Sequence, residues 1–515
     1  MTSTLYRNGQ VYSPAAPGAT ALLVRGATIA WVGQDADAPS ADRVVDLGGA
    51  LVAPAFVDAH VHATDTGIAL LGLDLAGVGS AAELLDRLSR YAAGLPADAV
   101  VLGHGWDESG WSVQVPPSAQ ELDRAAAGRR VYLSRACVHS ALVSPGLLAQ
   151  VAPDTPGYDE SGWLRRQAHH VVREIAMGSL GAAQRTAAQE AALRRAAQLG
   201  IAAVHECGGP GTSAESDFAA VLELGRRGDL PQVFGYWGEL GAAAKARELG
   251  AHGAGGDLYA DGSLGSQTAH LREPYLDSPD ASHGHGYLSA DEVAEHVLEC
   301  ARHGVQGGFH AIGDRAIATV LAGFGLAAAR VGVDVLRAGR HRIEHAELVD
   351  KQLIAGFVEF GVVASMQPAF DRLWGGESGM YAQRLGVRRS LASNPVGALA
   401  GVGVSLAFGS DSPVTPLDPW GTVRAAMCHH NPVYRVGLRT AFAAHTRGGW
   451  RAAGYDGEGV LAPGASATFA VWDVPGGLVR GLPVLTAGAD EPVPPLPVCR
   501  RTVLRGDVIF DAEGS

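Results

Sequence analysis

Lysine is nearly absent from this 515-residue sequence, which contains only Lys245 and Lys351. The chain has 40 basic and 53 acidic residues, which gives a formal net charge of −13. Nucleic acids and anionic membranes attract basic surfaces, so this balance argues against both as partners. A small-molecule substrate is the expected partner.

Cysteines are few, odd in number and never spaced as Cys-x-x-Cys, which argues against a disulfide framework and a thiolate zinc site. Each is expected to be a small buried side chain. Long apolar runs are also missing, because no window reaches about 18 uninterrupted apolar residues, the usual minimum for a spanning helix. The N-terminus lacks the basic and apolar regions of a signal peptide, so we expect a cytoplasmic protein without membrane contact. The cysteines are Cys137, Cys207, Cys300, Cys428 and Cys499.

Short runs of alternating apolar and polar residues, with Gly or Asn at the breaks, occupy the first 50 residues. A matching pattern returns near the other end in GVLAPGASATFAVWDV and VCRRTVLRGDVIFD. We therefore expect residues 1–54 and 455–515 to form one small composite β-sandwich.

Between these ends, short Val, Ile, Ala and Phe runs alternate with Ala-, Leu- and Arg-rich helical stretches, a pattern typical of a parallel sheet. A (β/α)8 barrel takes roughly 250 residues, so the chain is long enough for one. We predict an α/β fold with a TIM-like barrel over residues 55–454 and an insertion after the first barrel strand, at about 66–195. The eight strands are expected to end at His60, His205, Tyr236, Ala260, His310, His345, Gln367 and Asp411.

Histidines stand at several of these predicted strand ends. His60 and His62 are two residues apart, so their side chains point the same way and can share a metal ion. His310, His345 and Asp411 follow three later apolar runs. All strand ends of a barrel meet at one mouth, and four histidines with one aspartate suit Zn²⁺ or a similar divalent ion. Glu344 is expected to face the other side of its strand from His345 and to be structural.

The sequence resembles the amidohydrolase superfamily, specifically its YtcJ-like branch, which includes an N-substituted formamide deformylase. The likeness covers nearly the whole chain and rests on six motifs. The resemblance implies metal ligation by the four histidines and a metal-touching proton-transfer role for Asp411. The motifs are HVH at 60–62, GWDESGW at 105–111, DGSLGSQTA at 261–269, HAIGDRA at 310–316, RIEHA at 342–346 and GSDSPV at 409–414.

One position departs from that family. Many members carry a carboxylated lysine on the fourth strand that bridges two metal ions, but the matching residue here is Asp257. Neither lysine of the chain ends a predicted strand, so no carboxylated lysine is expected. Three alternatives remain: Asp257 as a shorter ligand or bridge, Glu206 reaching in from another strand, or a site with a single metal ion.

A bound zinc ion lowers the pKa of its water to about 7 and polarises a carbonyl group. Asp411 can accept the proton of this water and return it to a leaving nitrogen, the acid–base step that C–N cleavage needs. If only one ion binds, His310 or His345 can leave the metal and donate to the carbonyl oxygen, and the sequence does not choose between them.

Four further residues are candidates for substrate binding. Trp106, in the insertion, can form part of an aromatic lid. His270 and Arg272, in a glycine-containing loop, can meet a polar end of the substrate. Asp314 can orient an imidazole, or it can simply open a helix.

The leading interpretation is a metal-dependent hydrolase of a linear amide, N-acyl or N-formyl bond. Hydrolysis of an ester, lactone or cyclic amidine, and deamination, are alternatives, since the same attacking group serves each. A catalytically silent binding protein on this fold is the alternative from another class, although it has no need of Asp411. Homodimers are common in the resembled superfamily, so a homodimer is one candidate, although the oligomeric state is not readable from the sequence.

Overall fold

The computed structural model describes residues 2–513 except 136–139, 211 and 488–490. Its contacts divide the chain into two compact units. Unit 1 comprises Met1–Ala63 and Leu193–Ser515, and unit 2 comprises Thr64–Ala192.

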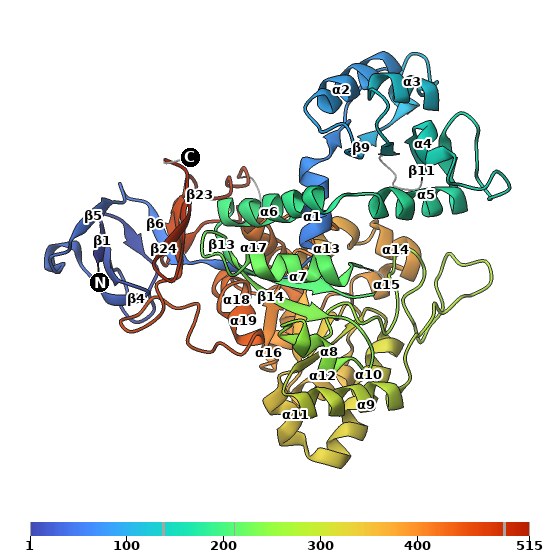
Figure 1. Cartoon of the computed structure of the whole chain (residues 1–515). Helices are drawn as coiled ribbons and strands as arrows, with labels where there is room; N and C mark the ends of the chain where they lie inside the picture. Colours follow the sequence, from blue (N-terminus) through green and yellow to red (C-terminus); the bar gives the residue numbers. More distant parts are fainter. Residues whose placement is uncertain (1, 136–139, 211, 488–490, 514–515) are drawn as a thin grey trace. The chain divides into compact units, whose positions relative to one another are not determined.

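A nearly closed barrel of eight parallel strands forms the centre of unit 1, with helices on its outside (Figure 1). The first and last strands are not paired along their length. An isolated bridge between Val61 and Ser412 connects them instead, and the backbone N–H of His62 donates to the Ser412 carbonyl at 3.0 Å. The predicted barrel is confirmed. Its strands, in order around the barrel, are β7 (Phe56–Val61), β13 (Ile201–Gly208), β14 (Gln232–Trp237), β15 (Gly253–Ala254), β16 (Gln306–Ala311), β17 (Arg342–His345), β18 (Val363–Met366) and β19 (Leu406–Phe408).

The fourth strand ends earlier than predicted, at Ala254 and not at Ala260. Gly255 and Gly256 follow it with φ angles of 155° and 75°, a region that glycine adopts without a steric penalty. A Cβ atom on Gly255 would lie 2.3 Å from the backbone nitrogen of Gly308 in the next strand. This close approach interrupts the strand and leaves Asp257 in the loop beyond it.

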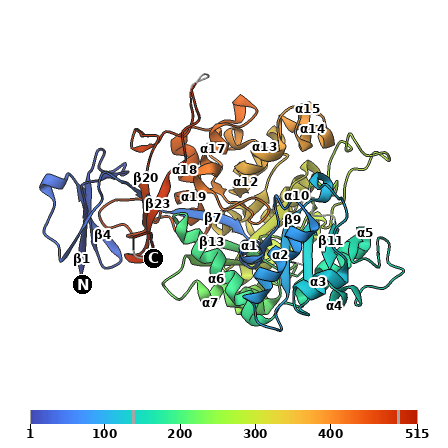
Figure 2. The ribbon, with the colours of Figure 1, turned by 90° about the horizontal axis from the view of Figure 1, so that it is seen from above.

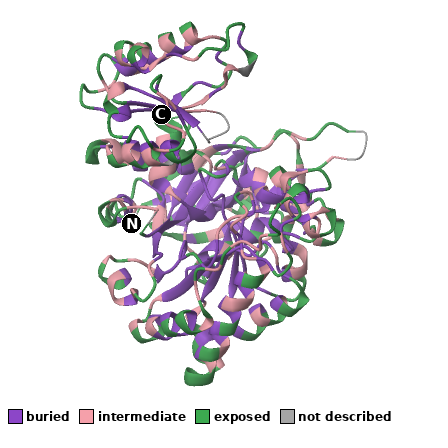
Figure 3. Cartoon of the chain, turned by 90° about the vertical axis from the view of Figure 1, so that its right-hand side faces the viewer, coloured by how far each residue is buried: buried purple, intermediate pink, exposed green. Residues whose placement is uncertain are grey.

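The barrel strands are buried on both faces, as a parallel sheet covered by helices requires. Every residue of β7 and β13 is buried, and Figure 3 shows buried residues concentrated in the strands and exposed residues on the outer helices. The outer helices include α7 (Glu215–Leu224), α8 (Ala243–Glu248), α9 (Ala290–His303), α10 (Asp314–Val331), α11 (Val333–Gly339), α12 (Lys351–Phe360), α16 (Val396–Gly401), α17 (Pro419–Met427), α18 (Leu438–Ala444) and α19 (Arg447–Ala452).

Helix α9 shows how local sequence sets these elements. Ser289 and Glu292 form a capping box at its start, and Gly304 ends it with a left-handed φ of 64°. After β18 the chain instead forms three short helices, and two of them contribute side chains to the site described below. These helices are α13 (Pro368–Trp374), α14 (Met380–Leu385) and α15 (Val387–Ser390).

Strands from both ends of the chain build a small β-sandwich in unit 1, as predicted (Figure 2). One sheet comes from the N-terminal segment, and the other combines N-terminal and C-terminal strands. The first contains β1 (Ser3–Arg7), β3 (Ala21–Arg25), β4 (Thr28–Gly33) and β5 (Arg43–Asp46); the second contains β2 (Gln10–Val11), β6 (Leu51–Pro54), β20 (Phe469–Asp473), β23 (Val498–Leu504) and β24 (Asp507–Asp511).

Unit 2 is inserted after the first barrel strand and has a five-stranded sheet of its own. Its apolar core includes Trp106 and Trp111. The strands are β8 (Leu73–Asp74), β9 (Val101–Trp106), β10 (Val131–Arg135), β11 (Ser140–Val143) and β12 (Trp163–Arg165); the main helices are α2 (Ala81–Ala93), α3 (Ala119–Ala125), α4 (Pro145–Leu148) and α5 (Arg166–Gly178). Helices α1 (Ala63–Leu71) and α6 (Ala182–Gln198) lie at the boundaries between the two units.

Three of the cysteines, Cys207, Cys300 and Cys499, are buried as expected. Cys428 is exposed, which corrects the prediction, because it is the residue that caps the end of α17. Cys137 lies outside the described residues.

Across the described residues, no single helix has both the length and the apolar composition needed to span a membrane. The consecutive helices α10 and α11 reach that threshold only as a pair, and they are bent by 120° where they meet.

Candidate metal-binding and active site

Six side chains from five strands and the loops that follow them converge at the carboxyl-terminal mouth of the barrel. Asp257 lies at their centre: its carboxylate is 3.5 Å from Nε2 of His60, 3.2 Å from Nε2 of His62, 3.5 Å from Nδ1 of His310 and 3.9 Å from Nε2 of His345. Asp411 approaches His60 and His62: its Oδ1 lies 3.6 Å from Nε2 of His60 and 3.1 Å from Nε2 of His62. All six predicted ligands are therefore brought together.

Two of the groups of candidate ligand atoms found among the described residues share Asp257. His60, His62 and Asp257 form one group, and Asp257, His310 and His345 form another, each with its ligand atoms within 4.8 Å of one another. Asp257 thus occupies a position between two pairs of imidazoles.

The cluster fits a bound cation. Nε2 of His60, Oδ1 of Asp257 and Nδ1 of His310 are buried and have no hydrogen-bond partner among the described residues. Buried polar atoms without a partner are rare in folded proteins, because each carries a desolvation penalty. A divalent ion bound by nitrogen and carboxylate ligands satisfies all three at once.

The electrostatics of the cluster agree with this fit. Burial alone would lower the pKa of His62, but hydrogen bonding to Asp257 and Asp411 and their negative charges raise it well above its ordinary value. Burial would raise the pKa of Asp257, but the neighbouring imidazoles, above all His60, hold it well below its ordinary value. The carboxylates therefore stabilise positive charge at this point.

Three of the four histidines are oriented by a hydrogen bond from the ring nitrogen that faces away from the cluster. Nδ1 of His60 lies 2.9 Å from Oε2 of Glu344, and Nδ1 of His345 lies 2.8 Å from Oε1 of Gln367. Nε2 of His310 lies 3.2 Å from the carbonyl oxygen of Gly262. When each outer nitrogen donates its proton, the inner nitrogen is left as a lone-pair ligand.

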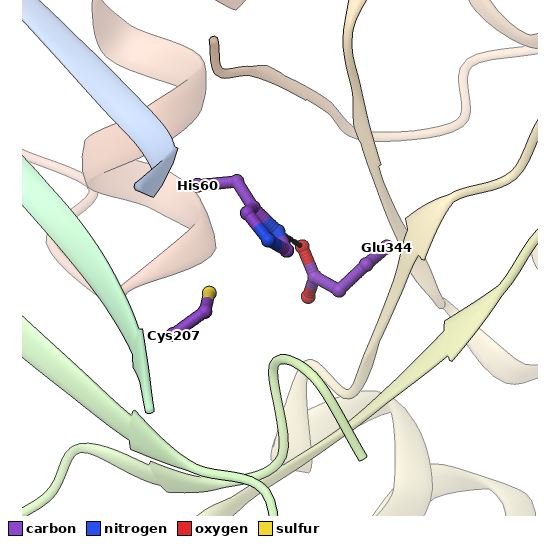
Figure 4. Close-up of side chains that lie close together, drawn as sticks. All are labelled: His60, Cys207 and Glu344. Atoms are coloured by element: carbon purple, nitrogen blue, oxygen red, sulfur yellow. Dashed lines mark hydrogen bonds and ion pairs between the residues drawn. The ribbon is translucent and has the colours of Figure 1, made fainter. Parts of the chain in front are cut away.

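Glu344 has its own buried support below the cluster. Figure 4 shows its carboxylate directed at the His60 ring, with Cys207 on the other side. The guanidinium of Arg342 donates to Oε2 of Glu344 at 2.9 Å and lies 2.8 Å from Nδ1 of His205. Glu344 and Arg342 are both fully buried. Each neutralises the charge of the other, because an unpaired charge in the barrel interior would carry a large desolvation penalty.

The expectation that Glu344 faces away from His345 and is only structural is therefore corrected by its contact with His60. It assumed regular alternation along β17, but His345 and Ala346 adopt left-handed φ angles of 69° and 48°. The backbone turns at His345, so both this imidazole and the Glu344 carboxylate face His60. The sequence did contain a signal for this role. Arg342 and Glu344 are two residues apart on a predicted strand, and opposite charges at this spacing point to the same side of the strand and can pair.

Glu206, one of the alternatives for the bridging ligand, is placed elsewhere: its Oε2 accepts the backbone N–H of Ala63 at 2.8 Å, and it is not part of the ligand groups found among the described residues. Lys245 lies in α8 and pairs with Glu215 and Glu239, at 2.6 and 2.7 Å. Lys351 begins α12. Asp257 is thus the acidic residue that occupies the centre of the cluster.

A cavity of about 450 Å³ opens beside the cluster, within unit 1. Five of the six predicted ligands line it: His62, Asp257, His310, His345 and Asp411. Its other walls are largely apolar. They comprise Tyr259, Gly262, Ser263, Leu264, Gly265, Thr268, Ile312, Glu347, Phe370, Trp374, Met380, Tyr381 and Val414.

Three predicted substrate contacts lie outside this cavity lining and have structural partners. Arg272 forms an ion pair with Asp350 at 2.6 Å. Asp314 is the first residue of α10 and accepts the backbone N–H of Arg272 at 2.8 Å, which matches the alternative of a helix-opening acid. The backbone N–H of His270 donates to Asp261 at 2.8 Å, so this loop is fixed by its own contacts.

Trp106 belongs to unit 2, where its side chain is fully buried. Its indole N–H donates to the Leu133 carbonyl at 2.8 Å, and its ring lies 5.6 Å from that of Trp163. Packing in the core of unit 2 therefore accounts for this residue, and burial gives no support to a role in substrate contact.

Two cavity residues were not anticipated from the sequence. The Tyr259 hydroxyl lies 3.4 Å from Oδ2 of Asp257, and its ring centroid lies 4.7 Å from that of His310. Glu347 is 2% exposed, and burial raises its pKa to about 7. Each lies two residues after a predicted ligand, Tyr259 after Asp257 and Glu347 after His345. This position was the only sequence signal for their place in the cavity.

This barrel and its cluster of histidine and carboxylate ligands define the class of metal-dependent hydrolases. The sequence profile of the amidohydrolase family matches residues 43–510, and the chain belongs to that family. The resemblance noted from the motifs is confirmed.

Known relatives agree with this assignment. The chain is similar to the putative amidohydrolase YtcJ of Bacillus subtilis (strain 168), with 27% identity over 424 residues that cover 74% of each protein. It is also similar to the N-substituted formamide deformylase of Arthrobacter pascens, with 23% identity and 78% coverage of each. Among solved structures, an uncharacterized metal-dependent hydrolase from Pyrococcus furiosus superposes with a TM-score of 0.76 at 28% identity, over 91% of this chain and 98% of that one.

Proposed function

We propose that this protein hydrolyses a C–N bond of a small linear amide, of the N-acyl or N-formyl type, with zinc as its metal. The observation that carries this proposal is the convergence of four imidazoles and two carboxylates, three of whose buried atoms have no hydrogen-bond partner among the described residues. The relative named as an N-substituted formamide deformylase supports an amide as the substrate.

Two ions suit the ligand arrangement better than one. His60 and His62 would hold the first, His310 and His345 the second, and Asp257 would be shared between them because it belongs to both ligand groups. When bound, the metal supplies a water of lowered pKa and polarises the substrate carbonyl.

Asp411 would move the proton in this reaction. Its Oδ1 lies 3.1 Å from Nε2 of His62 and faces the cavity, so it is within reach of both the ligand cluster and a bound substrate. The carboxylate would accept a proton from the attacking water and return it to the leaving nitrogen, which would otherwise depart as a poor amide anion. Tyr259 would hold Asp257 in place through its hydroxyl group.

The experiment combines metal content with turnover. Metal would be measured on protein purified without added metal, beside a His60→Ala, His62→Ala double variant. Turnover of wild type and Asp411→Asn would be followed on a panel of N-formyl and N-acetyl amines with matched esters. About two zinc ions per chain, falling to one or fewer in the double variant, and amide hydrolysis reduced about a thousandfold by Asp411→Asn support the proposal. No metal uptake, or turnover of the esters alone, would overturn it.

A further inference from the structure

The cavity beside the ligand cluster has a continuous aromatic wall. The ring of Phe370 stacks on His345, with centroids 6.0 Å apart and planes 10° apart. Trp374 follows at 4.8 Å from Phe370, and Tyr381 at 6.3 Å from Trp374. Helices α13 and α14 supply these rings, so the wall begins at a ligand and extends away from it. Such a wall offers a large apolar contact to a flat ring.

In the described lining of the cavity, Glu347 is the buried carboxylate that lies apart from Asp257 and Asp411 of the ligand cluster. Glu347 lies two residues beyond the end of β17 and lines the same cavity while being 2% exposed. Tyr381 and Asn394 lie beside its carboxyl group, yet its Oε2 atom is buried without a hydrogen-bond partner among the described residues. Neither lysine nor arginine is found in the described lining of the cavity. This oxygen therefore lacks the donor that a buried carboxylate requires.

We propose that the cavity selects aromatic amides that also carry an amino group, with the ring along the wall formed by Phe370, Trp374 and Tyr381 and the amino group bound by Glu347. This rests on the proposed amide hydrolysis and names its substrate class. An ammonium group supplies both the hydrogen-bond donor and the positive charge that Oε2 lacks. Charge-assisted bonds of this kind are stronger than bonds between neutral groups.

The test uses two amides that differ in one group. These are N-formyl-2-(4-methylphenyl)ethylamine and its 4-aminomethyl analogue, which is cationic at neutral pH. Binding by calorimetry and hydrolysis would be measured on the zinc-loaded wild type, Glu347→Gln and Glu377→Gln. Glu377 is an exposed residue between α13 and α14, outside the described cavity lining, so its variant removes the same charge from a site next to the wall.

The wild type and Glu377→Gln are expected to bind the aminomethyl amide about tenfold or more tightly than the methyl amide. Glu347→Gln should abolish this preference, while Phe370→Leu should weaken binding of both amides. Equal affinity of the wild type for both amides, or a preference that survives in Glu347→Gln, would overturn the inference.

Failure of the proposed function gives a different result. If neither amide is hydrolysed but the aminomethyl compound still binds through Glu347, the inferred ligand class stands and amide hydrolysis does not. If both amides are hydrolysed without a preference that depends on Glu347, the reaction stands and the inference is wrong.

Discussion

Oε2 of Glu344 lies 2.9 Å from Nδ1 of His60, and this contact joins a buried ion pair to the candidate metal site. Arg342 holds the same carboxylate from below. The arrangement fixes which nitrogen of His60 carries the proton, and hence which nitrogen is free to bind a cation.

Glu344→Gln should therefore weaken metal binding without removing a ligand. The amide can still contact His60, but it lacks the charge that balances Arg342 and favours the Nδ1–H tautomer. We expect zinc affinity, measured by competition with a chelator, to fall about 10- to 100-fold. The control Glu295→Gln removes a carboxylate that pairs with Arg330 on the surface. Unchanged affinity in Glu344→Gln would show that the contact only packs the barrel.

Asp257→Ala tests the position at the centre of the cluster. This carboxylate contacts all four histidines, so its loss removes the group shared by the two ligand sets. Zinc content is expected to fall from about two ions per chain to one or fewer, with turnover reduced by at least about a hundredfold. Elemental analysis of the purified variant gives the measurement, and two tightly held ions would contradict the bridging role.

The structure brings the six predicted ligand positions together, and five of them could be placed from the strand pattern because each follows a short apolar run and parallel strands of a barrel bring such ends together. Asp257 was found by its alignment with the family's lysine and not by strand pattern, since β15 is only Gly253–Ala254. The orienting residue Glu344 was missed because regular alternation fails where His345 turns to a positive φ. Backbone irregularities of this kind depend on contacts between distant segments, which periodicity does not record.

The structure gives two of the predicted substrate-contact residues other surroundings. Arg272 is paired with Asp350, and Trp106 is buried in unit 2, because polar and aromatic side chains in loops have many available partners. The cavity wall comes instead from α13 and α14, whose aromatic residues have no distinctive spacing in the sequence. The cytoplasmic location and the homodimer stay predictions.

Gly255→Ala should destabilise the barrel and disturb Asp257. The new Cβ atom would lie 2.3 Å from the backbone nitrogen of Gly308, and backbone cannot move aside as a flexible side chain can. We expect the free energy of unfolding, measured in urea, to fall by about 2–4 kcal/mol, with a loss of bound zinc. Gly304→Ala is the matched control: its φ is also positive, at 64°, but no atom lies within 4 Å of the added Cβ, so a loss of about 1 kcal/mol is expected. Equal losses in the two variants would contradict a steric role for Gly308.

Two buried histidines and one half-buried histidine at the amino-terminal end of the barrel predict how stability depends on pH. Burial lowers the pKa of His252, His341 and His445 to about 4. Unfolding returns each to its ordinary value near 6.5, so between pH 6.5 and 4 the unfolded chain binds more protons than the folded chain. The stability that the neutral rings contribute is therefore complete above pH 6.5 and is lost as the pH falls toward 4.

Urea unfolding of the metal-free protein between pH 7.5 and 4.5 measures this effect without interference from metal release. Because His62 and Glu347 also titrate in this range, the effect is measured as the difference in the free energy of unfolding between the wild type and His445→Gln, which should be constant above pH 7 and change steadily below about pH 6.5. His445→Gln should reduce the slope by about one proton, because the amide can still donate to the Val57 carbonyl, 3.0 Å from Nδ1 of His445, but does not titrate. A slope identical to that of the wild type would mean that His445 becomes protonated in the folded protein as readily as in the unfolded chain.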